Sequence, residues 1–125
     1  MTPVVLVVDN EMGFLILFSS LVQRMGYRTL QANSGTAALD LLDQQTPDLM
    51  VLDLAMPEMS GYDVLRQVMT MPRLDKMPVM VLTTTNLGPA SEDVAHRIGA
   101  WVTKPVRPEV FDATMRELLD GTGHE

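Results

Sequence analysis

Residues 49–53 read Leu-Met-Val-Leu-Asp, an unbroken apolar run that ends in a carboxylate. An apolar run of this length without alternation is typical of a strand that is buried on both faces of a sheet. Three further apolar runs occupy residues 4–8, 79–82 and 100–102. Residues 27–32 instead alternate, which is typical of a strand nearer the edge of a sheet. The sequence therefore predicts five strands.

Apolar residues at helical spacing occupy the segments that follow these five strands. Ser34 is a candidate N-cap for the second helix, and Gly26 is a candidate stop for the first. The fourth helix is expected at about residues 89–98, with Pro89 near its start and Gly99 at its end. The apolar positions of the other helices are Leu15, Phe18, Val22 and Met25; Ala38, Leu41 and Leu42; Val64, Leu65, Val68 and Met69; and, after Pro108, Phe111, Met115, Leu118 and Leu119.

Strand and helix alternate five times, which predicts an α/β fold with right-handed crossovers, a parallel sheet and helices on both faces. The 125 residues suffice for one domain and leave no room for a second. We expect this domain to cover residues 1–121, followed by a polar tail over residues 122–125. In an open parallel sheet, ligands bind outside the carboxyl ends of the strands, so the residues at those ends are the functional candidates.

Composition and charge exclude several classes of protein. A formal net charge of −7 argues against binding to the phosphate backbone of DNA or RNA. The chain has no cysteine, which excludes disulfide scaffolds, cysteine-ligated zinc and thiol chemistry. The apolar run at residues 4–8 is too short to cross a membrane and follows no basic segment. We therefore expect a cytoplasmic protein with neither nucleic-acid nor membrane partners.

Chemically active side chains stand at the ends of four predicted strands. They are Asp9, Asn10 and Glu11 after the first strand, Asp53 after the third, Thr83 and Thr84 after the fourth, and Lys104 after the fifth. Carboxylate and carbonyl oxygens are ligands for a hard cation such as Mg²⁺, while a hydroxyl and an ammonium bind phosphate oxygens. The set predicts a site for Mg²⁺ and a phosphoryl group, with Asp53 as a carboxylate nucleophile.

Four motifs in this order give the chain a resemblance to a known family, and the resemblance covers the whole chain. The motifs are Val-Val-Asp-Asn-Glu at 7–11, Leu-Asp-Leu-Ala-Met-Pro-Glu-Met-Ser-Gly at 52–61, Thr-Thr at 83–84 and Lys-Pro at 104–105. The chain resembles the receiver domain of two-component response regulators, and in particular a stand-alone, chemotaxis-type receiver. The resemblance implies a flavodoxin-like three-layer sandwich with strand order 2-1-3-4-5. It also implies phosphoryl transfer from a histidine kinase or phosphotransfer protein with Mg²⁺.

The resemblance also implies a role for individual residues. Asp53 matches the phosphoacceptor, and Thr83 and Lys104 match the groups that bind the phosphoryl oxygens. The residues that match the metal ligands are Asp9, Asn10, Asp53 and, through its carbonyl, Ala55. Thr83 and Trp101 match the pair of residues that move in the switch, and Pro105 matches a proline whose preceding peptide bond is cis. Asn10 departs from the family pattern, in which a second carboxylate stands at this position. An amide oxygen coordinates Mg²⁺ without adding charge, so we expect weakened metal binding.

In the family pattern, phosphorylation of Asp53 draws Thr83 toward the phosphoryl group, and the aromatic ring at position 101 turns into the space left behind. The face formed by the fourth helix, the fifth strand and the fifth helix would then bind a downstream protein partner. Candidate contacts on this face are His96, Arg97 and Trp101. The alternative is that Trp101 stays packed and the signal leaves through the loop at residues 54–60.

Purely structural roles are also open. Asp53 alone is compatible with a turn or helix cap, and Trp101 is equally compatible with a ring that fills space between the last strand and the fourth helix. A structural turn accounts for Gly61. No function is assigned to methionines at core-type positions, where methionine fills gaps. These methionines are Met25, Met50, Met69, Met80 and Met115.

Three other functions share parts of this pattern. A phosphatase of the haloacid dehalogenase type uses an aspartate nucleophile, but it needs a second aspartate two positions later, where this chain has Ala55 after Asp53 and Glu11 after Asp9. A flavodoxin needs a hydroxyl-rich phosphate loop after the first strand, where residues 9–12 would repel phosphate. A pseudo-receiver keeps the fold and binds partners without phosphorylation, and the amide at position 10 is compatible with it.

Overall fold

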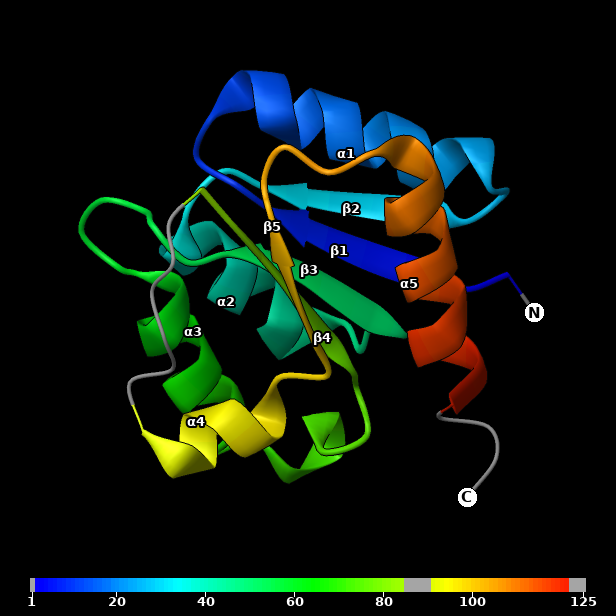
Figure 1. The fold of residues 1–125 in the computed structure, drawn as a ribbon. Coiled ribbons are helices and arrows are strands. Elements are labelled where there is room, and N and C mark those ends of the chain that lie inside the picture. The colour runs from blue at the N-terminus through cyan, green and yellow to red at the C-terminus, as the bar shows by residue number, and fades with distance from the viewer. Residues whose placement is uncertain (1, 85–90, 122–125) are drawn as a thin grey trace.

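Five parallel strands form one central sheet with helices on both faces. The computed structural model describes residues 2–84 and 91–121 of the chain. Within these residues the strands are β1 (Val4–Val8), β2 (Arg28–Ala32), β3 (Leu49–Asp53), β4 (Val79–Thr83) and β5 (Ala100–Thr103). The α-helices are α1 (Met12–Arg24), α2 (Gly35–Gln44), α3 (Gly61–Val68), α4 (Glu92–Arg97) and α5 (Pro108–Gly121). The sheet order is β2-β1-β3-β4-β5, which confirms the predicted fold (Figure 1).

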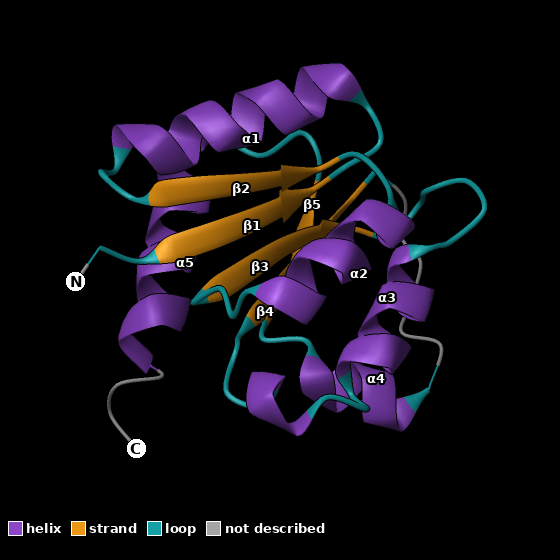
Figure 2. Ribbon diagram, turned by 180° about the vertical axis from the view of Figure 1, so that it is seen from behind, coloured by secondary structure: helices purple, strands orange, loops and turns teal. Residues whose placement is uncertain are grey.

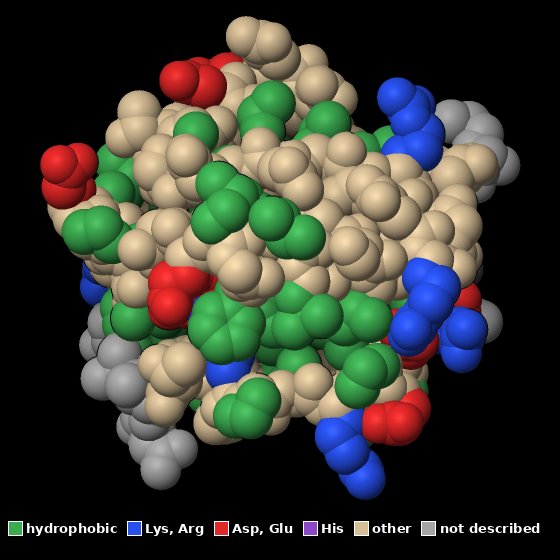
Figure 3. Space-filling model, turned by 90° about the horizontal axis from the view of Figure 1, so that it is seen from above, with side chains coloured by type: hydrophobic (Ala, Val, Ile, Leu, Met, Phe, Trp, Pro, Cys, Tyr) green, Lys and Arg blue, Asp and Glu red, His purple; other side chains and the backbone are tan. Residues whose placement is uncertain are grey.

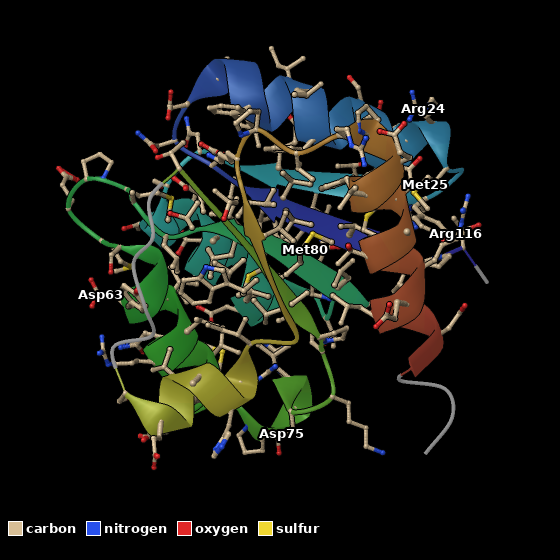
Figure 4. All side chains as sticks on the ribbon, viewed as in Figure 1. Arg24, Met25, Asp63, Asp75, Met80 and Arg116 are labelled. Carbon is tan, nitrogen blue, oxygen red and sulfur yellow. The ribbon has the colours of Figure 1, made fainter. Side chains whose placement is uncertain are left out.

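The sheet separates two hydrophobic cores because side chains alternate along each strand. Val5 and Val7 of β1 belong to the core beneath α1 and α5, whereas Leu6 and Val8 belong to the core beneath α2, α3 and α4. Figure 2 shows α2 in front of the sheet, with α3 and α4 at the lower right of the view. At the far end of α1, Arg24 lies beside α5 and approaches Asp112, with 3.4 Å between Nη2 and Oδ2 (Figure 4).

The starts and stops of the helices follow the predicted local chemistry. Ser34 caps α2, because its hydroxyl accepts the backbone N–H of Ala37 at 3.0 Å. Gly26 follows α1 with a φ of +89°, a conformation in which a side chain is strained. Gly61 begins α3 so close to β3 that an added Cβ would lie 2.5 Å from the carbonyl oxygen of Asp53. Gly61 therefore permits a close backbone approach, in addition to the predicted turn.

Several predicted boundaries differ from those of the structure. The fourth helix spans Glu92–Arg97, and the predicted start at residues 89–90 lies outside the described part of the chain, as does the predicted tail at residues 122–125. A 3-10 turn at Pro72–Leu74 was not predicted, because three residues are too few for a periodic pattern. Met69 was predicted in the core but is 37% exposed, because it caps the end of α3 at the surface.

The outer face of α1 is unusually apolar. Met12, Ile16 and Leu17 are 57%, 55% and 45% exposed. Figure 3 shows hydrophobic side chains gathered on this side of the molecule, with most charged groups around them. None of the helices in the described residues is long and apolar enough to cross a membrane.

Candidate functional site

Strand alternation brings Asp9, Asp53 and Lys104 to one face of the sheet at the carboxyl ends of the strands. Asp9 follows Val5 and Val7 at two-residue steps along β1, Asp53 ends β3, and Lys104 follows β5. Because residues two positions apart on a strand share a face, all three side chains point toward the core beneath α1 and α5. Their exposed fractions are 2%, 3% and 5%. Three ionisable groups that the sequence places 44 and 51 residues apart thus share one buried cluster.

The ammonium of Lys104 lies between the two carboxylates. Its Nζ is 2.7 Å from Oδ2 of Asp9 and 3.4 Å from Oδ1 of Asp53. The second oxygen of Asp9, Oδ1, accepts the backbone N–H of Glu11 at 2.9 Å. The sequence predicted that the three residues would meet, but not that Lys104 would lie closer to Asp9 than to Asp53.

Phe14 is a site residue that the sequence analysis missed. Nζ of Lys104 lies 4.1 Å from the centroid of the Phe14 ring. The spacing of Phe14 and Phe18 by one helical turn was available from the sequence. The contact with Lys104 was not, because it depends on how α1 lies across the sheet.

Burial raises the pKa of the Asp53 carboxyl above its usual value of 3.8. The charge of Lys104 and its hydrogen bond oppose this rise, and so does the backbone N–H of Ala55, whereas the nearby Asp9 carboxylate adds to it. The two carboxylates and one ammonium carry one net negative charge in a poorly hydrated site. Burial is the largest cause of the raised pKa, so the ionised form of Asp53 is costly even beside the Lys104 ammonium.

Oxygen ligands for a hard cation are present beside this cluster. The expected set combines the carboxylates of Asp9 and Asp53 with the side-chain oxygen of Asn10 and the carbonyl of Ala55, and the last two residues are exposed. Among the described residues, no group of three or more His, Cys, Asp or Glu side chains is placed to hold a metal ion. Because Asp9 already accepts two hydrogen bonds, a cation would share its oxygens with Lys104 and Glu11. The donors fit Mg²⁺, with less negative charge than a two-carboxylate metal site beside the acceptor would supply.

Thr83 and Trp101 lie on the other face of the sheet, toward α4. Thr83 ends β4, is fully buried, and its carbonyl accepts the backbone N–H of Lys104 at 2.7 Å. Trp101 is half-buried and packs against the core beneath α2, α3 and α4. The peptide bond between Lys104 and Pro105 is cis.

The other two predicted contacts near Trp101 differ in exposure. His96 is exposed, whereas Arg97 is half-buried and donates to the carbonyl of Leu74 at 2.7 Å. Arg97 thus has a structural partner, whereas the side chain of His96 is exposed and that of Trp101 is half-buried.

Comparison with protein families gives one match that spans most of the chain. The family described as response regulator receiver domain matches residues 5–116. Among curated proteins, the polar-differentiation response regulator DivK of Brucella ovis is 32% identical over 117 residues, which are 93% of this chain and 94% of DivK. The transcriptional regulatory protein AfsQ1 of Streptomyces coelicolor is 32% identical over 123 residues, which are 94% of this chain and 51% of AfsQ1. The chain therefore spans nearly all of one relative and about half of the other.

Solved structures have the same architecture. A CheY-like receiver domain from Methanospirillum hungatei superposes with a TM-score of 0.88 over 98% of both chains, at 22% identity, which shows the fold alone. The chemotaxis response regulator CheY4 of Vibrio cholerae has a TM-score of 0.84 and 26% identity, covering 94% of this chain and 99% of CheY4.

Replacing Asp53 by Asn should stabilise the protein at neutral pH. Because the pKa of Asp53 is raised on folding, ionised Asp53 costs stability, and this cost develops as the pH rises from 3.8 through the folded-state pKa. The Asp53→Asn variant should therefore have a higher urea midpoint than the wild type at pH 7, and the difference should shrink toward pH 4. Urea unfolding measured across this pH range tests the expectation.

The matched control is Asp9→Asn, which removes the closer partner of the buried ammonium. It should lower stability at pH 7 by roughly 1–3 kcal/mol, opposite in sign to Asp53→Asn. A stability difference between Asp53→Asn and the wild type that is the same at all pH values, or a loss at pH 7, would contradict the raised pKa of Asp53.

Proposed function

The chain belongs to the response regulator receiver domain family, and we propose that it works by accepting a phosphoryl group on Asp53 and presenting the change to a partner protein. The observation that carries the proposal is the buried cluster, in which Lys104 lies 3.4 Å from the Asp53 carboxylate at the edge where ligands bind to such sheets. Receiver domains interact with histidine kinases or phosphotransfer proteins, so we propose a phosphohistidine of such a protein as the donor.

The proposed reaction is the attack of an Asp53 carboxylate oxygen on the donor phosphorus. A P–O bond forms to Asp53 as the P–N bond of the phosphohistidine breaks, and the leaving imidazole nitrogen keeps the electron pair of that bond. Lys104 offsets the negative charge that gathers on the phosphoryl oxygens. Thr83 would donate its hydroxyl hydrogen to one of these oxygens in the product.

Mg²⁺ is the proposed cofactor, held by Asp9, Asp53, Asn10 and the carbonyl of Ala55. When bound, it supplies positive charge next to the phosphoryl oxygens. Asp9 and Lys104 are linked through this site, because the same Asp9 carboxylate that would bind the cation now binds the ammonium at 2.7 Å.

The proposed readout is the face formed by α4, β5 and α5. Thr83 and Trp101 both lie on the α4 side of the sheet, so a shift of Thr83 toward Asp53 would change the packing next to Trp101. His96 and Trp101 are the contacts that we propose for the downstream partner.

A pseudo-receiver is the second candidate function, and two observations favour it. Position 10 carries an amide in place of a carboxylate, and Lys104 pairs more closely with Asp9 than with the proposed acceptor. A phosphatase of the haloacid dehalogenase type is less well supported, because Ala55 occupies the position of its general acid. A direct test of phosphoryl uptake separates these functions.

Incubation with acetyl phosphate and Mg²⁺ should add one phosphoryl group to the protein, measured as intact mass. Asp53→Asn should abolish the gain, whereas Asp43→Asn, which removes an exposed carboxylate on α2, should leave it unchanged. Lys104→Met should slow uptake by about tenfold or more, because the developing charge loses its nearest cation. Full uptake by Asp53→Asn, or none by the wild type, would refute the proposed acceptor.

The same assay at a series of Mg²⁺ concentrations tests the metal site. One added carboxylate at about 4 Å from a divalent ion contributes roughly 2 kcal/mol at the dielectric of water, partly offset by repulsion between carboxylates. Asn10→Asp should therefore reach half-maximal uptake at about tenfold lower Mg²⁺. Equal Mg²⁺ requirements would show that position 10 is not a ligand.

Beryllofluoride, which stands in for the phosphoryl group, should change the emission of Trp101, the single tryptophan of the chain. The expected cause is a change in packing between β5 and α4 when Thr83 moves. Asp53→Asn serves as the control that binds no beryllofluoride. Saturation of Asp53 without any change in Trp101 emission or in the amide signals of residues 91–103 would contradict the switch.

A further inference from the structure

The Lys104 ammonium is enclosed by an aromatic ring as well as by carboxylates. Its side chain is 1% exposed, and its Nζ lies 4.1 Å from the centroid of Phe14. A cation at this distance over a ring face is attracted by the quadrupole of the ring. An ammonium has three N–H donors, and the carboxylates of Asp9 and Asp53 accept two of them. The ring occupies the place of a third polar partner.

The Phe14 ring is itself held in position by two further rings. Phe14 and Phe18 stack with centroids 5.8 Å apart and planes at 8°, and Phe18 and Phe111 stack at 5.3 Å and 19°. Phe18 and Phe111 are 1% and 0% exposed. The three phenylalanines of the chain thus form one column, which runs from the Lys104 ammonium past α1 to α5. Phe18 and Phe111 pack in the core, so stacking on Phe18 favours the orientation in which the half-buried Phe14 ring lies beside Lys104.

We propose that Phe14 is a positioning residue, whose ring fixes the Lys104 ammonium between Asp9 and Asp53 and so sets where the cation meets the phosphoryl group. This inference rests on the proposed function of Asp53. Lys104 reaches the cluster on a long flexible stem from β5, so without the ring its ammonium would have more rotamers and more contact with water. A fixed ammonium loses less freedom when the phosphoryl charge develops.

The test compares two substitutions that keep an apolar side chain at this position. Phe14→Leu removes the ring face. Phe14→Tyr keeps it, and Phe14 borders a surface hollow that it lines with Glu11, Gly13 and Leu17. Each protein is first compared by urea midpoint, since only folded variants report on Lys104. Phe14 is half-buried, so both variants should fold.

The first readout is the NMR signal of the Lys104 Hζ protons in unphosphorylated protein. A ring face near an ammonium moves these signals upfield, so Phe14→Leu should shift them downfield and Phe14→Tyr should keep them near the wild-type position. This pattern reports the contact between the ring and the ammonium, and the rate comparison below separates a positioning role from a merely structural one. Because no phosphoryl group is involved, this readout tests the contact even if Asp53 proves not to be the acceptor.

The second readout is the initial rate of phosphoryl uptake from acetyl phosphate. Phe14→Leu should slow uptake roughly 3- to 30-fold, in line with the strength of a desolvated cation–π contact, and Phe14→Tyr should restore the rate to within about twofold of the wild type. Unchanged Hζ signals in Phe14→Leu, or an unchanged rate despite shifted signals, would overturn the proposal. Absence of uptake by the wild type would instead overturn the proposed function.

Discussion

The buried ion cluster of Lys104 with Asp9 and Asp53 is the constraint on which the site depends. Removing charges from water is costly, and each of these three groups is nearly inaccessible to solvent. The buried ammonium of Lys104 therefore depends on a carboxylate partner, and its closer partner is Asp9 at 2.7 Å. The sheet order makes the cluster possible, because β1 and β3 are neighbours and bring Asp9 next to Asp53. β5 lies beyond β4, so only a long side chain such as lysine spans the remaining distance.

The residues around Lys104 hold both its backbone and its ammonium in place. Its backbone N–H binds the carbonyl of Thr83, which ties the end of β5 to the end of β4. Its ammonium is bounded by two carboxylates and the ring of Phe14. Carboxylate oxygens are ligand types that suit a divalent cation, and an ammonium is a partner that suits phosphoryl oxygens. The cluster therefore contains the donor types that the proposed function needs.

Much of the fold could be predicted because a doubly covered parallel sheet imposes a strong pattern. Strands such as 49–53 must be apolar throughout, and their ends then identify the edge at which Asp9, Asp53, Thr83 and Lys104 gather. The boundaries of the helices were less predictable. The 3-10 turn at Pro72–Leu74 is too short to give a periodic sequence pattern, and Met69 has the spacing of a core residue although it lies at the exposed end of α3.

Two features of the site depend on three-dimensional packing and left no clear sign in the sequence. The contact of Phe14 with Lys104 depends on the direction in which α1 crosses the sheet. The closer pairing of Lys104 with Asp9 than with Asp53 depends on distances that differ by only 0.7 Å, from 2.7 to 3.4 Å. Strand alternation assigns a residue to a face but does not fix differences of this size.

The most direct test of the central role of Lys104 is a ¹³C NMR titration of the Asp53 carboxyl in the wild type and in Lys104→Met. Burial raises the pKa of Asp53 above 3.8 while Lys104 opposes the rise. Asp53 should therefore titrate above 3.8 in the wild type and at a still higher pH in the variant. The same Asp53 pKa in both proteins would show that Lys104 does not hold the carboxylate in its ionised form, and would contradict this account of the site.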